Sequence, residues 1–261
     1  MGTGVEPGLP GWQAGRITDD AVAASTTNAL SAAGFRSALE GQATAEQRAK
    51  YIRYFPGDDS FVGVRMGDVF ALAGRSLGMP VGEIETLLDS PVHEVRAGAC
   101  SIMGKAATHR TATMARQREL YELYLRRHDG IDSWDLVDLA AHQVLGTWLL
   151  DKPRDPLDTL AASAFWPERR SAIVATAAFL KRRQTADTLR LATTLVADDN
   201  DFVQKGTGWM LRYLGEIDRP ALLGFLDQHA AVMPRTMLRA ASEKLDQPLR
   251  TRYLAAARQV G

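Results

Sequence analysis

Three segments of this chain share one pattern at nearly constant spacing. Each begins with a basic residue, continues with small residues and ends in larger apolar ones, and the basic residues are Arg170, Lys205 and Arg239, spaced by 35 and 34 residues. A fourth copy begins at Arg96, 74 residues before Arg170, or two periods of 37. A period in the mid-thirties indicates helical hairpins, each of which must stack on its neighbours to bury its apolar face.

The remaining sequence also favours helices. Alanine, leucine and arginine are abundant, and apolar residues recur at helical spacing in segments 21–40 and 45–55. The missing copy of the repeat would fall near residue 133, where another helix is expected to begin. No segment shows the alternation typical of strands. The fold class predicted is therefore all-α, a curved solenoid of stacked antiparallel helix pairs.

The first residues differ from the rest. Residues 1–16 contain four glycines and two prolines before Trp12, and we expect them to form a disordered leader to a single domain over residues 17–261. The start lacks the basic end and apolar run of a secretory signal. No apolar run reaches the ~18 residues that a membrane span requires. We therefore expect a cytoplasmic protein.

Several kinds of chemistry are poorly supported. Cys100 is the one cysteine, which excludes an intrachain disulfide and a cysteine-rich metal site. The five histidines form no HExxH pair, and neither a phosphate-binding glycine loop nor a dinucleotide fingerprint occurs. The sequence therefore predicts no metal site and no nucleotide cofactor.

Charge alone does not identify a partner. The chain has 31 basic and 31 acidic residues, although dedicated nucleic-acid binders are usually basic. The repeat nevertheless predicts that Arg96, Arg170, Lys205 and Arg239 form a basic row along one face of the solenoid. Such a row can bind the phosphates of a duplex. It can equally consist of solvated residues near helix starts, or belong to a scaffold that binds a protein.

A tryptophan and two acids begin the helix expected near residue 133. Asp132 or Ser133 can cap it, and Asp135 lies in its first turn, where an acid complements the helix dipole. Asp138 has no such explanation, and it shares a helix face with Trp134, four residues earlier. A weak pair between Asp138 and His142, four residues later, is the structural alternative.

Two further aromatic residues are ambiguous. Trp209 follows Gly206 and Gly208, so it is either a core residue or an indole beside which the glycines leave room for a ligand. Tyr51 can belong to the core or to a groove, and its spacing does not decide between them.

The order of several motifs resembles the DNA alkylation repair glycosylases of the AlkD type, over about Ala45 to Leu254. The motifs are Phe61–Arg65, Ser90–Arg96, Ser133–Asp138, Glu168–Thr176, Val203–Arg212 and Met233–Arg239. The resemblance implies a fold of stacked HEAT-like hairpins.

The resemblance also implies roles for individual residues. The family's catalytic aspartate falls on Asp138, and its two aromatic walls fall on Trp134 and Trp209. The arginine that grips the DNA backbone beside the lesion falls on Arg170, with Arg169 as the adjacent candidate.

A tyrosine of the family's early helix falls on Tyr51. A lysine that relatives carry two turns after the arginine is replaced by Ala178, although Lys181, Arg182 and Arg183 follow. Because of this replacement, the resemblance does not identify which residue takes the place of that lysine at the DNA phosphates beside the lesion.

The activity that the resemblance implies is excision of cationic alkylated purines, of the 3-methyladenine and 7-methylguanine type or bulkier, from double-stranded DNA. The enzyme would stabilise the sugar oxocarbenium ion without flipping the base, and it would need no cofactor. We expect a monomer that associates with the nucleoid when bound to DNA. The alternatives are a relative that binds DNA structure without catalysis, and a HEAT-type scaffold for protein partners.

Overall fold

The computed structural model describes residues 30–54 and 60–256. Within these ranges the chain is helical and contains no β-strand, and one isolated bridge joins Ser60 to Val92. The predicted all-α class is therefore confirmed. The predicted leader, residues 1–16, lies outside the described residues.

The helices follow one another at short intervals. In chain order they are α2 (Ala32–Glu40), α3 (Ala45–Tyr54), α4 (Met66–Arg75), α5 (Val81–Leu88), α6 (His93–Thr108), α7 (Met114–Arg126), α8 (Trp134–Ala141), α9 (Asp155–Ala161), α10 (Trp166–Ala175), α11 (Ala177–Leu180), α12 (Ala186–Thr194), α13 (Asp201–Ile217), α14 (Arg219–His229), α15 (Arg235–Ala241) and α16 (Gln247–Ala256). A π-helical turn, His142–Gly146, extends α8. Of the predicted helix 21–40, α2 is the described part.

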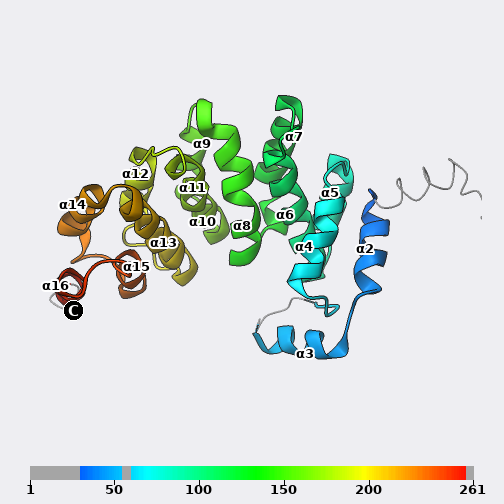
Figure 1. Cartoon of the computed structure of the whole chain (residues 1–261), viewed down its shortest axis with the longest axis horizontal. Helices are drawn as coiled ribbons and strands as arrows, with labels where there is room; N and C mark the ends of the chain where they lie inside the picture. The colour runs from blue at the N-terminus through cyan, green and yellow to red at the C-terminus, as the bar shows by residue number, and fades with distance from the viewer. Residues whose placement is uncertain (1–29, 55–59, 257–261) are drawn as a thin grey trace, which may run out of the picture.

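These helices form an elongated row, from α2 at one end to α16 at the other (Figure 1). The helices that carry the repeated basic motif are neighbours, because α10 packs on α13 and α13 packs on α15. On the other side, α10 packs on α8 and α8 packs on α6. The sequence repeat thus corresponds to a spatial repeat of packed helices.

Small residues in the repeat allow this close packing. A Cβ atom added to Gly208 of α13 would lie 2.6 Å from the Met237 carbonyl oxygen and 2.6 Å from the Ala240 Cβ, both on α15. Gly104 of α6 is similarly close to the Leu139 carbonyl oxygen, at 2.8 Å. Larger side chains at these positions would force the helices apart.

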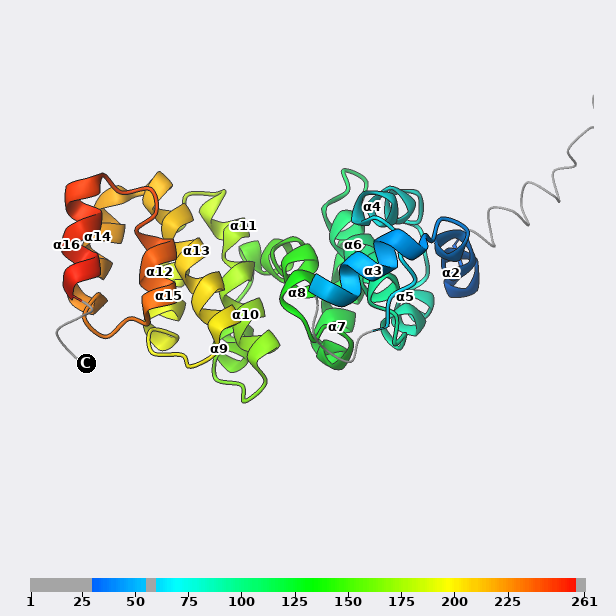
Figure 2. The same ribbon diagram turned by 90° about the horizontal axis from the view of Figure 1, so that it is seen from below.

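Helix α3 departs from the row. It crosses beneath the helices of the first half of the chain (Figure 2), and none of its residues is buried. In the described part of the chain, no helix is both long and apolar enough to cross a bilayer.

Candidate functional site

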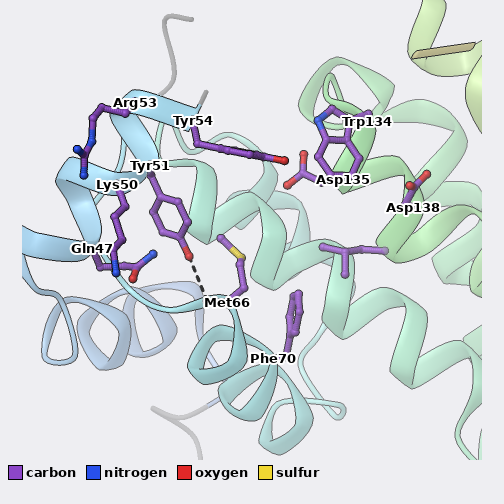
Figure 3. Close-up of a pocket in the computed structure, with 11 residues that line it drawn as sticks. Gln47, Lys50, Tyr51, Arg53, Tyr54, Met66, Phe70, Trp134, Asp135 and Asp138 are labelled. Atoms are coloured by element: carbon purple, nitrogen blue, oxygen red, sulfur yellow. Dashed lines mark hydrogen bonds between the residues drawn. The ribbon is translucent and has the colours of Figure 1, made fainter. Parts of the chain in front are cut away.

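A pocket of about 830 Å³ opens between helices α3, α4 and α8 (Figure 3). Aromatic rings and carboxylates line it together, with cationic side chains of α3 at its edge. The lining residues are Gln47, Lys50, Tyr51, Arg53, Tyr54, Met66, Phe70, Trp134, Asp135, Asp138 and Leu139. Three residues singled out from the sequence, Tyr51, Trp134 and Asp138, therefore lie in one cavity.

Asp138 is held by an arginine of the next repeat. Arg170 donates from Nε to Oδ1 of Asp138 at 3.0 Å and from Nη2 to Oδ2 at 2.8 Å. The two side chains are 5% and 21% exposed, respectively. Asp138 thus pairs with Arg170 and not with His142, which was the alternative from helix spacing. A bidentate pair of this kind fixes both the position and the orientation of the carboxylate.

The electrostatics of Asp138 combine opposing effects. Burial raises the pKa of its carboxyl group, the hydrogen bonds and charge of Arg170 lower it, and the negative charge of Asp135 raises it again. The net result is a pKa above the ordinary value of an aspartate. Perturbed carboxylates of this kind are typical of functional sites.

Asp135 also faces the pocket, although its position in the sequence predicts only a role at the helix start. Ser133 is the N-cap of α8, and its hydroxyl donates to Oδ1 of Asp135 at 2.6 Å. Oδ2 of Asp135 lies 2.7 Å from Nε2 of His93 on α6. Burial acts to raise the pKa of Asp135, but the bonds to His93 and Ser133 prevail and lower it.

Helix α3 supplies two tyrosines on one face. The hydroxyl of Tyr51 donates to the Val64 carbonyl at 3.0 Å and accepts from the Met66 amide at 3.2 Å, and burial raises its pKa. Tyr54 is 69% exposed and reaches over the pocket (Figure 3). Tyr54 is not among the residues predicted from the sequence, although its spacing of three from Tyr51 places both on the same helix face.

Trp209 is not part of this cavity. It packs partly buried against the core from α13. Protein atoms fill the space next to both Gly206 and Gly208. A Cβ atom at Gly206 would lie 3.0 Å from Nη1 of Arg170, and Gly208 contacts α15. The role of Trp209 as a second aromatic wall stays a prediction.

The predicted basic row is not uniformly exposed. Arg96 is 6% exposed, donating to the Ser90 carbonyl at 3.1 Å and to Asp132 at 3.1 Å. Arg170 is likewise buried, and its guanidinium donates hydrogen bonds to the carboxylate of Asp138. Arg96 and Arg170 thus bind groups of the protein itself, so two of the four cations of the predicted row are buried. The role of the row in binding DNA stays a prediction.

The other predicted cations lie in two different settings. Lys205 and Arg239 are exposed, and Lys205 lies 3.6 Å from Asp201 on its own helix. Arg169 binds Asp198 through Nε at 2.7 Å and Nη2 at 3.1 Å. It therefore belongs to a contact between neighbouring repeats, whereas Arg170 reaches the pocket carboxylate.

The pocket resembles a site for an organic cation more than a metal site. Among residues 30–54 and 60–256, no group of three or more His, Cys, Asp or Glu side chains is arranged to hold a metal ion. Rings and carboxylates together can stabilise a positive charge on a bound molecule.

Comparison with known proteins identifies the family. The family model described as "DNA alkylation repair enzyme" matches residues 35–245. A solved structure titled "Predicted DNA alkylation repair enzyme from Enterococcus faecalis" is similar, with a TM-score of 0.63 and 18% identity, over 79% of this chain and 98% of that one. No curated protein matches the sequence. Because the family model covers most of its length, the chain belongs to the DNA alkylation repair enzyme family.

Proposed function

We propose that this protein is a DNA glycosylase that excises cationic alkylated purines from double-stranded DNA. The observation that carries the proposal is the position of Asp138. It lies in the wall of an aromatic pocket beside Trp134, and Arg170 fixes both of its oxygen atoms. A carboxylate held in this way can stabilise positive charge in a transition state without first having to reorient.

The chemistry requires little beyond electrostatics. A purine alkylated at N3 or N7 is positively charged, so it leaves readily as the glycosidic bond lengthens. The deoxyribose then develops oxocarbenium character, as in other glycoside cleavages. Asp138 would stabilise that cation and orient the attacking water, and Trp134 would hold the sugar. Trp209 is the second aromatic wall in this proposal.

Arg170 has an indirect role in this mechanism. Burial makes an ionised carboxylate costly, and the bidentate pair with Arg170 offsets part of that cost, so Asp138 ionises more readily than it would without Arg170. The family resemblance implies that Arg170 binds the DNA backbone. We propose that it positions Asp138 first, and that DNA phosphates are bound by the exposed cations Lys205 and Arg239 and, at the pocket edge, Lys50.

The shape of the site favours a large lesion. The pocket of about 830 Å³ is open and has room for an adduct larger than a methyl group. We further propose that the protein, a curved HEAT-like solenoid, acts as a monomer on the backbone side of the duplex and leaves the base stacked. Adducts bulkier than methyl would fit between α3 and α8.

The direct test is release of free base from duplex DNA that contains 3-methyladenine or 7-methylguanine. The proposal expects release by the protein alone, without added metal or cofactor. Binding to the duplex without release of any alkylated base would instead support a non-catalytic DNA-structure binder. Absence of duplex binding even at low salt would support the protein scaffold.

A further inference from the structure

Asp135 occupies an unusual place for a residue of a helix start. An acid in the first turn of a surface helix ordinarily lies in solvent near the free amide groups. The side chain of Asp135 is only 19% exposed, and the exposed part faces the pocket, between Tyr54 and Trp134 (Figure 3). Enclosing a carboxylate in this way costs free energy unless it is paired. The group that pairs with Asp135 therefore explains how its carboxylate can be enclosed.

That partner is His93, whose side chain has no exposed surface. Its Nε2 atom lies 2.7 Å from Oδ2 of Asp135, while Ser133 donates to Oδ1. Both carboxylate oxygens are thus bonded from the protein side, and the face towards the pocket is left to act on a ligand. Because the bonds to His93 and Ser133 favour the charged form, Asp135 is an anion that protonates only at low pH.

His93 also connects the two walls of the pocket. Its ring lies 5.4 Å from that of Phe61, which in turn lies 5.4 Å from the ring of Tyr51 on α3. The backbone amide of His93 donates to the Ser60 carbonyl at 2.9 Å. The buried imidazole of His93 therefore contacts the carboxylate of α8 and the ring of Phe61, which packs on Tyr51 of α3.

We propose that Asp135 is a second functional carboxylate of this pocket, and that His93 is the positioning residue that holds it there. The proposal rests on the proposed glycosylase function. It assigns stabilisation of the sugar cation to two acids on one face of α8. Asp135 supplies a second fixed negative charge near the developing sugar cation, beside the contact that Asp138 makes.

The two carboxylates are coupled by charge. The negative charge of Asp135 contributes to the raised pKa of Asp138, together with burial and against Arg170. Removing the charge of Asp135 should therefore lower the pH at which Asp138 titrates. Other titratable or charged groups around the two acids come from the pocket edge and the helices packed on α8; they are Lys50, Tyr51, Arg53, Tyr54, His93, Arg96, Cys100, Tyr124, Asp132, His142 and Arg170.

The first experiment needs no DNA. The side-chain carboxyl carbons of ¹³C-labelled aspartates are titrated by NMR, and the Asp138→Asn spectrum assigns the Asp138 signal. We expect Asp135→Asn to move the Asp138 midpoint to lower pH. The matched control is Asp132→Asn, which removes an acid that lies just before α8 and pairs with Arg96 outside the pocket. It should leave the Asp138 midpoint in place.

The second experiment measures single-turnover excision of 7-methylguanine. Asp135→Asn should reduce the rate roughly tenfold to a hundredfold, at or below the effect of one positioned contact. His93→Leu should reproduce this loss, because it removes the nitrogen that faces Oδ2. His93→Gln should restore most of the activity, because its amide nitrogen can occupy the place of Nε2. Thermal melts show which variants are folded.

The outcomes separate this proposal from the proposed function. A parent protein that excises no base contradicts the glycosylase, whatever the NMR result, while a shifted Asp138 midpoint would still support coupling of the two acids. An unchanged midpoint in folded Asp135→Asn, or full excision activity in that variant, overturns the role of Asp135. Equal loss in His93→Gln and His93→Leu overturns the positioning role of His93.

Discussion

Arg170 holds Asp138 across the boundary between two repeats, with two hydrogen bonds of 3.0 and 2.8 Å. Arg170 lies on α10 and Asp138 on α8, 32 residues earlier. Arg170 also donates to the Phe202 carbonyl on α13. The Arg170 guanidinium therefore links three helices that pack on one another, α8, α10 and α13. The stability of the repeats and the geometry of the pocket depend on the same residue.

Replacing Arg170 should affect stability and activity together. Arg170→Ala leaves a largely buried carboxylate without its cation, and breaking a buried pair costs about 3–5 kcal/mol. The free energy of unfolding from denaturant titration should fall by that order, and excision should fall as well. The control is Arg169→Ala, which breaks the pair with Asp198 but does not touch the pocket. Similar loss of excision in both variants, at equal stability, would contradict the specific role of Arg170.

The raised pKa of Asp138 predicts two pH effects of opposite sign. Excision requires the ionised form, so the rate should fall as the pH drops through a value above that of an ordinary aspartate. Stability behaves differently, because a carboxyl group whose pKa is raised by folding binds protons more tightly in the folded state. Its contribution to stability is present below the unfolded pKa and is lost as pH rises through the folded pKa.

Melting temperatures of the parent and Asp138→Asn, compared across pH, measure the second effect. The parent should lose stability relative to the variant as pH rises through the folded pKa of Asp138. A difference that stays constant over the acidic range would contradict the raised pKa.

Alanine substitutions at two glycines test how tightly the repeats pack. Gly208→Ala adds a methyl group 2.6 Å from atoms of α15, which should destabilise the protein by about 1–3 kcal/mol through overpacking. Gly224→Ala lies on α14 with no atom within 4 Å of the added Cβ, and it should stabilise the protein by about 0.5–1 kcal/mol. Denaturant titration of both variants gives the signs. Stabilisation by Gly208→Ala would show that α13 and α15 are less tightly packed than described.

Substitution of an exposed cation tests how the protein binds DNA. Lys205→Ala should weaken duplex binding about equally for all sequences, and it should reduce the slope of log affinity against log salt by about 1. The control is Arg118→Ala on α7, an exposed cation paired with Glu122 away from the pocket. Fluorescence anisotropy at several salt concentrations measures both. An equal change in the two variants would argue against a phosphate contact at Lys205.

The sequence predicted the helical class and the repeat because both depend on local periodicity. It also predicted that Trp134 and Asp138 share one helix face, which follows from a spacing of four residues. It could not predict the pairing of His93 with Asp135, since these residues are 42 positions apart and no local pattern joins them. For the same reason, the sequence did not reveal that Arg96 and Arg170 turn inward to carboxylates of neighbouring repeats.

Asp138 is proposed to stabilise the sugar cation during base excision. Asp138→Asn keeps the size of the side chain and removes its charge, so single-turnover release of 3-methyladenine and 7-methylguanine from duplex DNA tests the claim most directly. We expect the folded variant to be slower by up to ~10²–10³-fold, with a smaller loss for the lesion that leaves more readily. A folded Asp138→Asn protein that releases both bases as fast as the parent would contradict the account.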